Sequence, residues 1–254
     1  MRGFSLVELS IVLVILGLLT GGILAGRSLI RASELRAVGT EHSRWITATR
    51  AFQDKYLGLP GDLTNATAFW GKDATNCNSH TGTAAANGVC NGNGNTTLNA
   101  PTASGGWGEE YQFWRQLSFA GLIEGSYSGL SGSAGLTDTE VGMNAPASKL
   151  GKAGWSTGAL LNYPGDSGTF AYNYRNFLMF GNPSTTNRTF VSALRPEEAW
   201  NLDSKVDDGM PGRGKLMMLN WPSCTNAANY SDLDTTYKLD NNAIACSLIF
   251  PNAS

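Results

Sequence analysis

The first quarter of the chain changes from an unbroken apolar stretch to an amphipathic one. Residues 4–26 are mainly Leu, Ile, Val and Gly, and Glu8 is the only ionisable side chain among them. A helix of roughly 20 apolar residues is long enough to cross a bilayer, so this run predicts a transmembrane segment. A carboxylate inside such a segment costs about 2.5 to 3.5 kcal/mol on insertion scales, which indicates that Glu8 has a partner or a task.

The residues that follow keep a helical period but become mixed in polarity. Between residues 27 and 56 apolar side chains recur every three or four positions, with charged side chains mainly between them. The apolar set is Leu35, Val38, Trp45, Ile46, Phe52 and Tyr56. The stretch from about Ser5 to Tyr56 therefore predicts one helix of roughly 75 Å, whose second half lies on a globular head. Gly58 and Pro60 are expected to end it.

The rest of the chain, residues 57–254, predicts a mixed α+β head. Residues 108–121 predict a second helix, with two glutamates in its first turn and Trp114 in the core. A short helix is expected at 196–202, where Pro196 precedes two acids. Strand patterns occur at residues 169–174, 177–180, 189–191, 215–219 and 243–250. These strands would form an antiparallel sheet against the amphipathic half of the first helix.

The start of the chain also carries a known processing pattern. Gly3, then Phe4, then Glu8 at the fifth position after the glycine, and an unbroken apolar run resemble the class III signal of type IV pilins and type II secretion pseudopilins. The resemblance implies that a prepilin peptidase cuts after Gly3, that the new amine at Phe4 is methylated, and that Glu8 acts in assembly. It also implies a type IV pilin-like fold, in which a long N-terminal helix packs on an antiparallel sheet.

Glu8 has a physical reason to act between subunits. A chain cut after Gly3 presents a cationic amine at Phe4, and in a low-dielectric environment an amine and a carboxylate are costly alone and tolerable together. If the Phe4 amine of one subunit meets Glu8 of its neighbour, the pair sets the axial register of a filament. An ordinary secretory signal cleaved after the apolar run and an uncleaved signal anchor are the alternatives, and neither accounts for Glu8.

Composition and charge add little about partners. The chain has 254 residues, a net charge of -2 and 15% charged residues, well below the usual quarter of a soluble domain. Gly, Asn, Ser and Thr are abundant, as in many surface-exposed bacterial proteins. The balance is not basic enough to indicate nucleic acid binding over the whole surface.

Four cysteines without a CxxC motif, in a chain whose anchor predicts export, favour disulfides over metal ligation. Sequence proximity suggests the pairs Cys77 with Cys90 and Cys224 with Cys246, each contributing about 3 kcal/mol. Four cysteines allow three pairings, and a single bridge with two free thiols also stays open. A bridge across the last loop resembles the C-terminal bridged loop of many type IV pilins.

Three carboxylates, Asp203, Asp207 and Asp208, stand within six residues just ahead of Gly209. Hard cations such as calcium prefer oxygen ligands on a turning backbone, so the cluster is a candidate calcium site and calcium the only candidate cofactor. The alternative is a solvated loop in which Asp207 or Asp208 caps the turn before Gly209. Lys205 and Arg213 would then be the neighbouring cations.

A hydrolase is the least favoured interpretation. Gly165-Asp166-Ser167-Gly168 copies the sequence around the nucleophile of trypsin-like proteases, but a general base is also needed. The chain has only His42, on the amphipathic helix, and His80, in a polar loop without the context of that family. A four-residue glycine-rich match is common by chance, so we expect a turn there and no catalytic residues.

Together these features predict a filament subunit in four parts: a leader at 1–3, a transmembrane or filament-core segment at 4–26, an amphipathic segment at 27–56 and a head at 57–254. We expect a pilin of a type IV pilus-like filament, made in the inner membrane and exposed on the cell surface after assembly. Expected partners are further copies of the chain, the prepilin peptidase and an inner-membrane assembly platform. A pseudopilin in a periplasmic type II secretion pseudopilus is the alternative.

Overall fold

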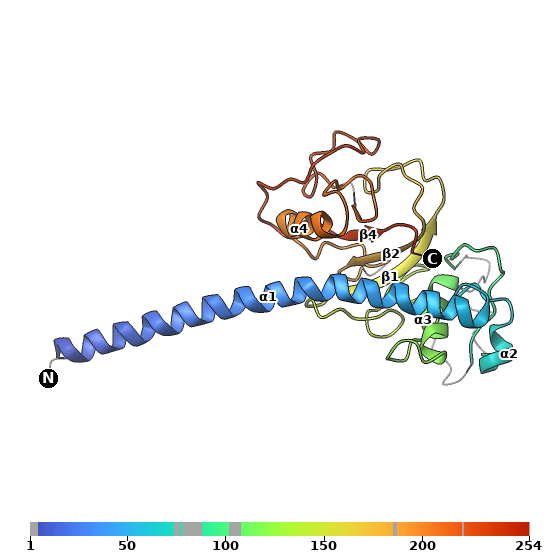
Figure 1. Cartoon of the computed structure of the whole chain (residues 1–254), viewed down its shortest axis with the longest axis horizontal. Coiled ribbons are helices and arrows are strands. Elements are labelled where there is room, and N and C mark those ends of the chain that lie inside the picture. Colours follow the sequence, from blue (N-terminus) through green and yellow to red (C-terminus); the bar gives the residue numbers. More distant parts are fainter. Residues whose placement is uncertain are drawn as a thin grey trace.

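A computed structural model describes residues 5–73, 77, 88–101, 108–184, 187–219 and 221–253. One helix, α1 (Leu6–Tyr56), projects far beyond the rest of the molecule, and its second half lies against a head (Figure 1). The head carries three further helices, α2 (Ala66–Trp70), α3 (Glu109–Phe119) and α4 (Pro196–Val206). It also holds a four-stranded antiparallel sheet, so the predicted α+β class with a long N-terminal helix is confirmed.

The sheet lies between two layers of the head. Its strands are β1 (Gly154–Leu160), β2 (Arg175–Gly181), β3 (Met217–Met218) and β4 (Leu248–Phe250), in the order β1-β2-β4-β3. Because side chains alternate along a strand, Phe180 and Leu248 face the core shared with α1 and α3, whereas Phe177 and Ile249 face the opposite side. That opposite side is covered by irregular chain, so the sheet is buried on both faces.

Three of the predicted strands overlap observed ones, at β2, β3 and β4, and two predictions are wrong. Residues 169–174 and 189–191 form only isolated bridges, Tyr163 with Tyr172 and Asn182 with Val191. Phe170 is fully buried, but it belongs to the irregular cover of the sheet rather than to the sheet itself. The alternation of apolar and polar residues at 169–174 therefore reflects the burial of a loop and not a strand. The first strand, β1, was not predicted, because its sequence GWSTGAL contains two glycines and no clear alternation.

The second half of α1 is held on the head by apolar packing. Its buried side chains are Val38, Trp45, Ala48, Thr49 and Phe52, and they recur on one side of the helix. The Trp45 ring meets the edge of Trp114 from α3 at 5.5 Å between centroids. Sequence analysis named Val38, Trp45 and Phe52 of this set. The structure shows that α1 contacts α3 and α4 and, through the rings at its end, also α2.

Polar contacts along α1 were not predicted. Oε2 of Glu41 accepts a hydrogen bond from the Trp155 indole at 2.8 Å, and its Oε1 accepts one from the Lys149 backbone N–H at 2.9 Å. Closer to the anchor, Arg31 donates through two nitrogens to the two carboxylate oxygens of Glu198 on α4, each at 2.7 Å. These contacts fix the rotation of α1 on the head.

An asparagine- and glycine-rich loop after the first disulfide is held by two buried carboxylates. The Asp62 carboxylate accepts N–H groups from residues 94–96, and the Glu109 carboxylate accepts N–H groups from Asn93 and Asn99. Gly92 lies so close to Asp62 that a Cβ would come within 2.0 Å of its backbone carbon. These carboxylates give residues 91–99 a defined path.

Candidate functional site

The first half of α1 is left uncovered by the described residues of the chain. Its large apolar side chains, from Leu6 to Ile30, are between 50% and 86% exposed, and Val38 is the first buried residue of the helix. The helix is long and apolar enough to cross a membrane. An exposed apolar surface of this size marks an interaction with a membrane or with other proteins.

The helix begins at Ser5 with a capping box. The Ser5 hydroxyl accepts a hydrogen bond from the Val7 N–H at 3.3 Å, and Oε2 of Glu8 accepts one from the Ser5 N–H at 2.8 Å. Glu8 therefore has a local role that sequence analysis did not anticipate, because it satisfies one of the unpaired N–H groups at the helix start. Gly3 and Phe4, the predicted processing residues, lie outside the described residues.

Glycines recur along the exposed half of α1 in two pairs spaced by four residues, Gly17 with Gly21 and Gly22 with Gly26. Each glycine costs a helix roughly 0.5–1 kcal/mol relative to alanine. A Cβ built at any of these four positions would meet nothing within 4 Å. Nothing in the described part of the chain therefore requires glycine there, whereas close contact between apolar helices does favour such pairs.

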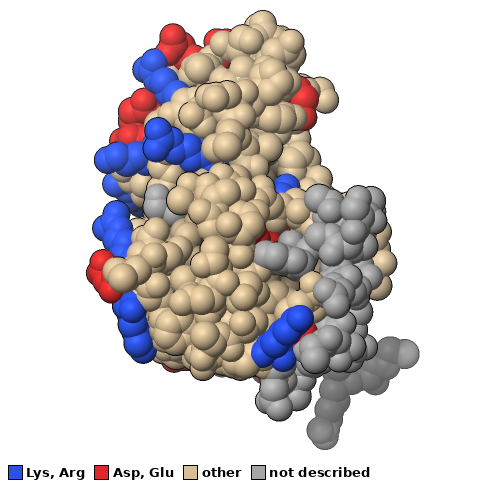
Figure 2. Space-filling model, turned by 90° about the vertical axis from the view of Figure 1, so that its right-hand side faces the viewer, with Lys and Arg blue, Asp and Glu red and all other residues tan. Residues whose placement is uncertain are grey.

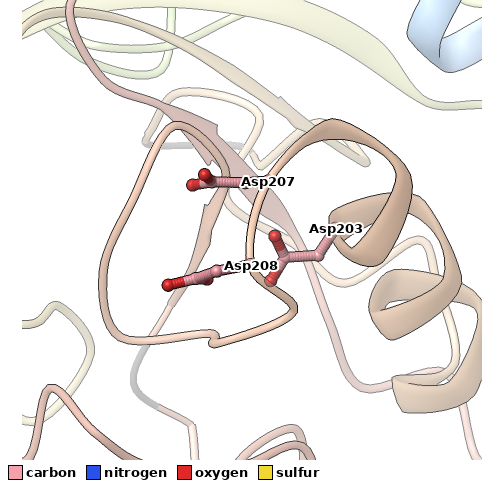
Figure 3. A group of neighbouring side chains, drawn as sticks. All are labelled: Asp203, Asp207 and Asp208. Carbon is pink, nitrogen blue, oxygen red and sulfur yellow. The ribbon is translucent and has the colours of Figure 1, made fainter.

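The predicted acidic residues come together at the C-terminal end of α4. Figure 3 shows Asp203 on the last turn of the helix and Asp207 and Asp208 on the loop that follows, with the Asp203 carboxylate directed toward the other two. One oxygen of each carboxylate lies within 4.8 Å of one oxygen of both others. Among the residues that the structure describes, these three form the group that could hold a metal ion.

The environment of the three carboxylates differs. Asp203 is fully buried, and its Oδ2 accepts a hydrogen bond from the Tyr237 hydroxyl at 2.7 Å. Burial, together with the nearby charges of Asp208 and Asp207, raises the pKa of Asp203 to about 7. Tyr237 lies 34 residues further along the chain, and no local sequence signal pointed to it.

Asp207 and Asp208 are partly exposed and also serve the loop. Asp208 accepts the Met210 N–H at 2.9 Å and forms an ion pair with Arg213 at 3.3 Å, while Asp207 accepts the backbone N–H of Lys215. The turn-capping role that sequence analysis left open is therefore present, with Arg213 as the neighbouring cation. Neither role excludes the other, because each carboxylate oxygen can accept more than one contact.

Two disulfides staple the head, Cys77 with Cys90 and Cys224 with Cys246. These are the two pairings that sequence proximity suggested. The second bridge joins the loop after Trp221 to the residue that precedes β4 by two positions. It therefore ties the C-terminal segment that carries Tyr237 to the core of the head.

Ser167, the candidate nucleophile, lies in a turn. The Asp166 carboxylate accepts the Gly168 N–H at 2.7 Å, which is the turn that sequence analysis expected. His42 is stacked on Phe250 at 4.0 Å between ring centroids, on the side of the sheet that faces α1. His80 lies outside the described residues.

The end of the head opposite the anchor is poor in charge. Figure 2 views this end, and it shows Lys and Arg side chains, with some acids, along one edge and few charges across the middle. A hollow of about 700 Å³ lies where α1 stops, and four of its lining residues, Leu57, Thr96, Asn162 and Arg175, have positive φ angles. Such backbone is strained for residues other than glycine.

Comparison with known proteins is the remaining source of evidence on family. Comparisons with profiles of known protein families, with curated proteins and with solved structures find no match. The features that bear on function are therefore those of the chain itself: the exposed half of α1, Glu8 at its start, and the stapled head.

Proposed function

We propose that this chain is the structural subunit of a type IV pilus-like filament. It is made as a membrane-anchored precursor, cleaved after Gly3, methylated at Phe4 and polymerised through the N-terminal half of α1. The head then forms the outer surface of the filament, and its role is mechanical and adhesive. In this proposal the inner membrane holds the precursor, and assembly moves the same apolar half of α1 from lipid into a bundle of identical helices.

The observation that carries the proposal is the division of α1 into a bare apolar half and a packed half. A helix that only anchors a head needs an apolar span, but it does not need to continue without interruption into the core of that head. Here the same helix supplies Trp45 and Phe52 to the core, while residues 5–30 contribute nothing to it. A rigid rod with one free end suits a subunit that must present identical apolar surfaces to its neighbours.

The glycine pairs and Glu8 support the same proposal. Glycines at four-residue spacing allow close helix contact, and nothing else in the described chain uses them. The Glu8 carboxylate lies at the very start of the helix, where a new amine at Phe4 of a neighbouring subunit would find it. Its present hydrogen bond to the Ser5 N–H occupies one oxygen only, which leaves the other for a cation.

The first experiment determines the N-terminal residue of the protein by intact mass measurement and fragmentation. It compares protein recovered from sheared cell surfaces with protein recovered from membranes. The proposal predicts a chain beginning at N-methylated Phe4 in the sheared fraction. The same processed chain confined to the membrane would instead favour a secretion pseudopilin. A chain that begins at Gly26, or one that still carries Met1, would rule out processing after Gly3.

A second experiment separates the assembly role of Glu8 from its capping role. Glu8→Gln keeps the length and the carbonyl oxygen that accepts the Ser5 N–H, but it removes the charge that would pair with an amine. We expect normal processing and at least a tenfold loss of sheared filaments. Glu34→Gln, which removes a carboxylate from the same helix outside the apolar run, is the matched control and should keep filaments. Full assembly of Glu8→Gln, combined with failure of Glu8→Ala, would assign Glu8 to capping alone.

A further inference from the structure

The acidic cluster of Asp203, Asp207 and Asp208 has a feature that acidic loops on a protein surface lack. Asp203 is fully buried, and its Oδ2 is bonded to Tyr237. The Gly209 backbone N–H also favours its charged form, but no donor among the described residues meets hydrogen-bond geometry at its Oδ1. A buried carboxylate oxygen without a partner is costly, and native proteins leave few such groups unexplained. Figure 3 shows that the Asp203 carboxylate is directed toward the other two acids, so its open oxygen faces negative charge.

Basic side chains in the described part of the chain do not balance this cluster. Arg213 lies on its outer side, where it pairs with Asp208 at 3.3 Å and also with the exposed Asp234. Within the described residues, no Lys or Arg forms an ion pair with Asp203 or Asp207. The contact that Lys215 makes with Asp207 comes from its neutral backbone N–H. A single guanidinium group, that of Arg213, therefore accompanies four neighbouring carboxylates. They belong to Asp203, Asp207, Asp208 and Asp234.

We propose that Asp203, Asp207 and Asp208 hold a divalent metal ion, and that the ion is calcium. All three ligands are carboxylate oxygens, which hard cations prefer over the nitrogen and sulfur ligands that suit zinc or copper. Coordination geometry favours calcium over magnesium. Calcium binds oxygens at about 2.3–2.6 Å in flexible arrangements, whereas magnesium holds them at about 2.0–2.1 Å.

The three oxygens lie within 4.8 Å of one another, close enough for all three carboxylates to share one ion. Remaining coordination positions would be filled by water and by backbone carbonyls of the loop. Calcium accepts such irregular sets of six to eight oxygens, while magnesium requires a near-ideal octahedron.

The proposed ion would join three parts of the head. Asp203 belongs to α4, Asp207 and Asp208 belong to the following loop, and Tyr237 connects Asp203 to the segment between Cys224 and Cys246. The same helix α4 carries Glu198, which pairs with Arg31 of α1. Bound calcium would therefore stabilise the side of the head that meets the middle of α1. This inference does not depend on the proposed filament function.

The test uses the full chain in detergent, freed of metal with a chelator. Terbium is the first probe, since its luminescence is excited by nearby aromatic rings such as Tyr237, and calcium should displace it with a stoichiometry of one per chain. Addition of CaCl2 to about 1 mM, the range of extracellular calcium modules, should raise the thermal unfolding midpoint by several degrees. The same concentration of MgCl2 should raise it much less.

Two variants remove ligands, and one serves as the control. Asp203→Asn and Asp208→Asn should each weaken calcium binding at least tenfold, whereas Asp240→Asn, at an exposed aspartate outside the cluster, should bind as the unmodified chain does. Asp203→Asn has a second signature. It keeps an acceptor for Tyr237 and removes the buried charge, so in chelator it should unfold at a higher temperature than the unmodified chain.

The proposal is overturned by a folded, unmodified chain that binds no calcium at about 1 mM. It is equally overturned if Asp203→Asn and Asp208→Asn both retain the full calcium response. Near-ultraviolet circular dichroism of each variant in chelator shows that the head is folded, so loss of binding is not confused with loss of structure.

Discussion

The two halves of α1 share one continuous backbone and have opposite surroundings. Residues from 5 to about 30 carry apolar side chains that are at least half exposed, whereas Phe52 and Val38 in the second half are almost completely buried. The first half is uniformly apolar around its circumference, and the second half is apolar on one side only. A helix that is apolar all round needs cover on every side, and the described part of this chain does not provide it.

The difference indicates which contacts stabilise each half of the helix. The second half is stabilised within the chain, through packing against α3, α4 and the sheet. The first half receives no such packing from the described residues, so its stabilisation must come from other surroundings. Substitutions in the two halves should therefore affect different measurements, and four comparisons along α1 test this separation.

The largest expected effect comes from deleting the most buried ring of the helix. Phe52 is 0% exposed and packs against Tyr56 and Trp70, so Phe52→Ala should lower the free energy of unfolding of the head by about 3–5 kcal/mol. Leu13→Ala, at a residue 62% exposed, should change it by less than about 0.5 kcal/mol. Denaturant unfolding of both variants in detergent, followed by tryptophan fluorescence, measures the contrast. Equal losses in the two variants would contradict the separation.

The next effect depends on pH and arises at His42. Burial against the sheet lowers the pKa of His42 to about 4 from its usual 6.5. Between these values the unfolded chain binds a proton that the folded chain does not, so stability falls as the pH is lowered from about 6.5 toward 4. Because the ring is partly exposed, we expect this residue to account for about 2 kcal/mol of the loss.

His42→Phe keeps a ring that can stack on Phe250 but cannot titrate. The difference in unfolding free energy between this variant and the unmodified chain should widen as the pH falls through that range. Subtraction of the two curves isolates His42 from the carboxylates that titrate nearby. A difference that does not change with pH would mean that the imidazole is accessible to protons in the folded head.

A smaller effect is expected at the ion pair between α1 and α4. Burial alone would raise the pKa of Glu198, but hydrogen bonds from Arg31 and from the Arg195 backbone outweigh it and lower the pKa. Arg31→Gln should cost the head about 1 kcal/mol, since the pair is bidentate but partly exposed. Arg27→Gln, an exposed residue one turn earlier, should leave stability unchanged. Urea unfolding at low and high salt should show the first difference shrinking with salt.

The smallest expected effect is an increase in the stability of the head. Leu57 ends α1 with a φ of 56°, a conformation that glycine adopts without strain, and its side chain is 91% exposed. Leu57→Gly should therefore stabilise the head by about 0.5 kcal/mol. Leu24→Gly, in the bare half, should leave unfolding of the head unchanged. A clear loss of stability in Leu57→Gly would show that the exposed leucine makes a contact that the isolated chain does not display.

Much of the helical structure could be predicted from sequence, because helical periodicity and end signals are local. The end of α1 at Tyr56, the two glutamates at the start of α3 and Pro196 at the start of α4 all lie where local patterns placed them. The strands of the sheet were harder to predict from sequence. Both faces of β1 are covered, so its sequence has no polar side to mark a strand, and residues 169–174 show strand-like alternation while serving as a buried loop.

The candidate sites divide in the same way. Asp203, Asp207 and Asp208 are close in sequence, so their proximity could be predicted, as could the two disulfides between near neighbours. The burial of Asp203 and its bond to Tyr237 depend on packing across 34 residues and could not. Glu8 was identified from the leader pattern, but its capping bond to Ser5 was overlooked, although both residues stand in a Ser-x-x-Glu pattern.

The uninterrupted path of α1 has a mechanical consequence. The helix enters the head from the side of the N-terminus and ends at the opposite side (Figure 1). It buries Trp45 and Phe52 along this path. Tension applied at the N-terminus along the helix axis would load these contacts in shear and at the same time, rather than peeling them apart one by one. Parallel loading gives the greatest resistance to rupture for a given set of contacts, so a pull from the anchored end meets the head in its strongest direction.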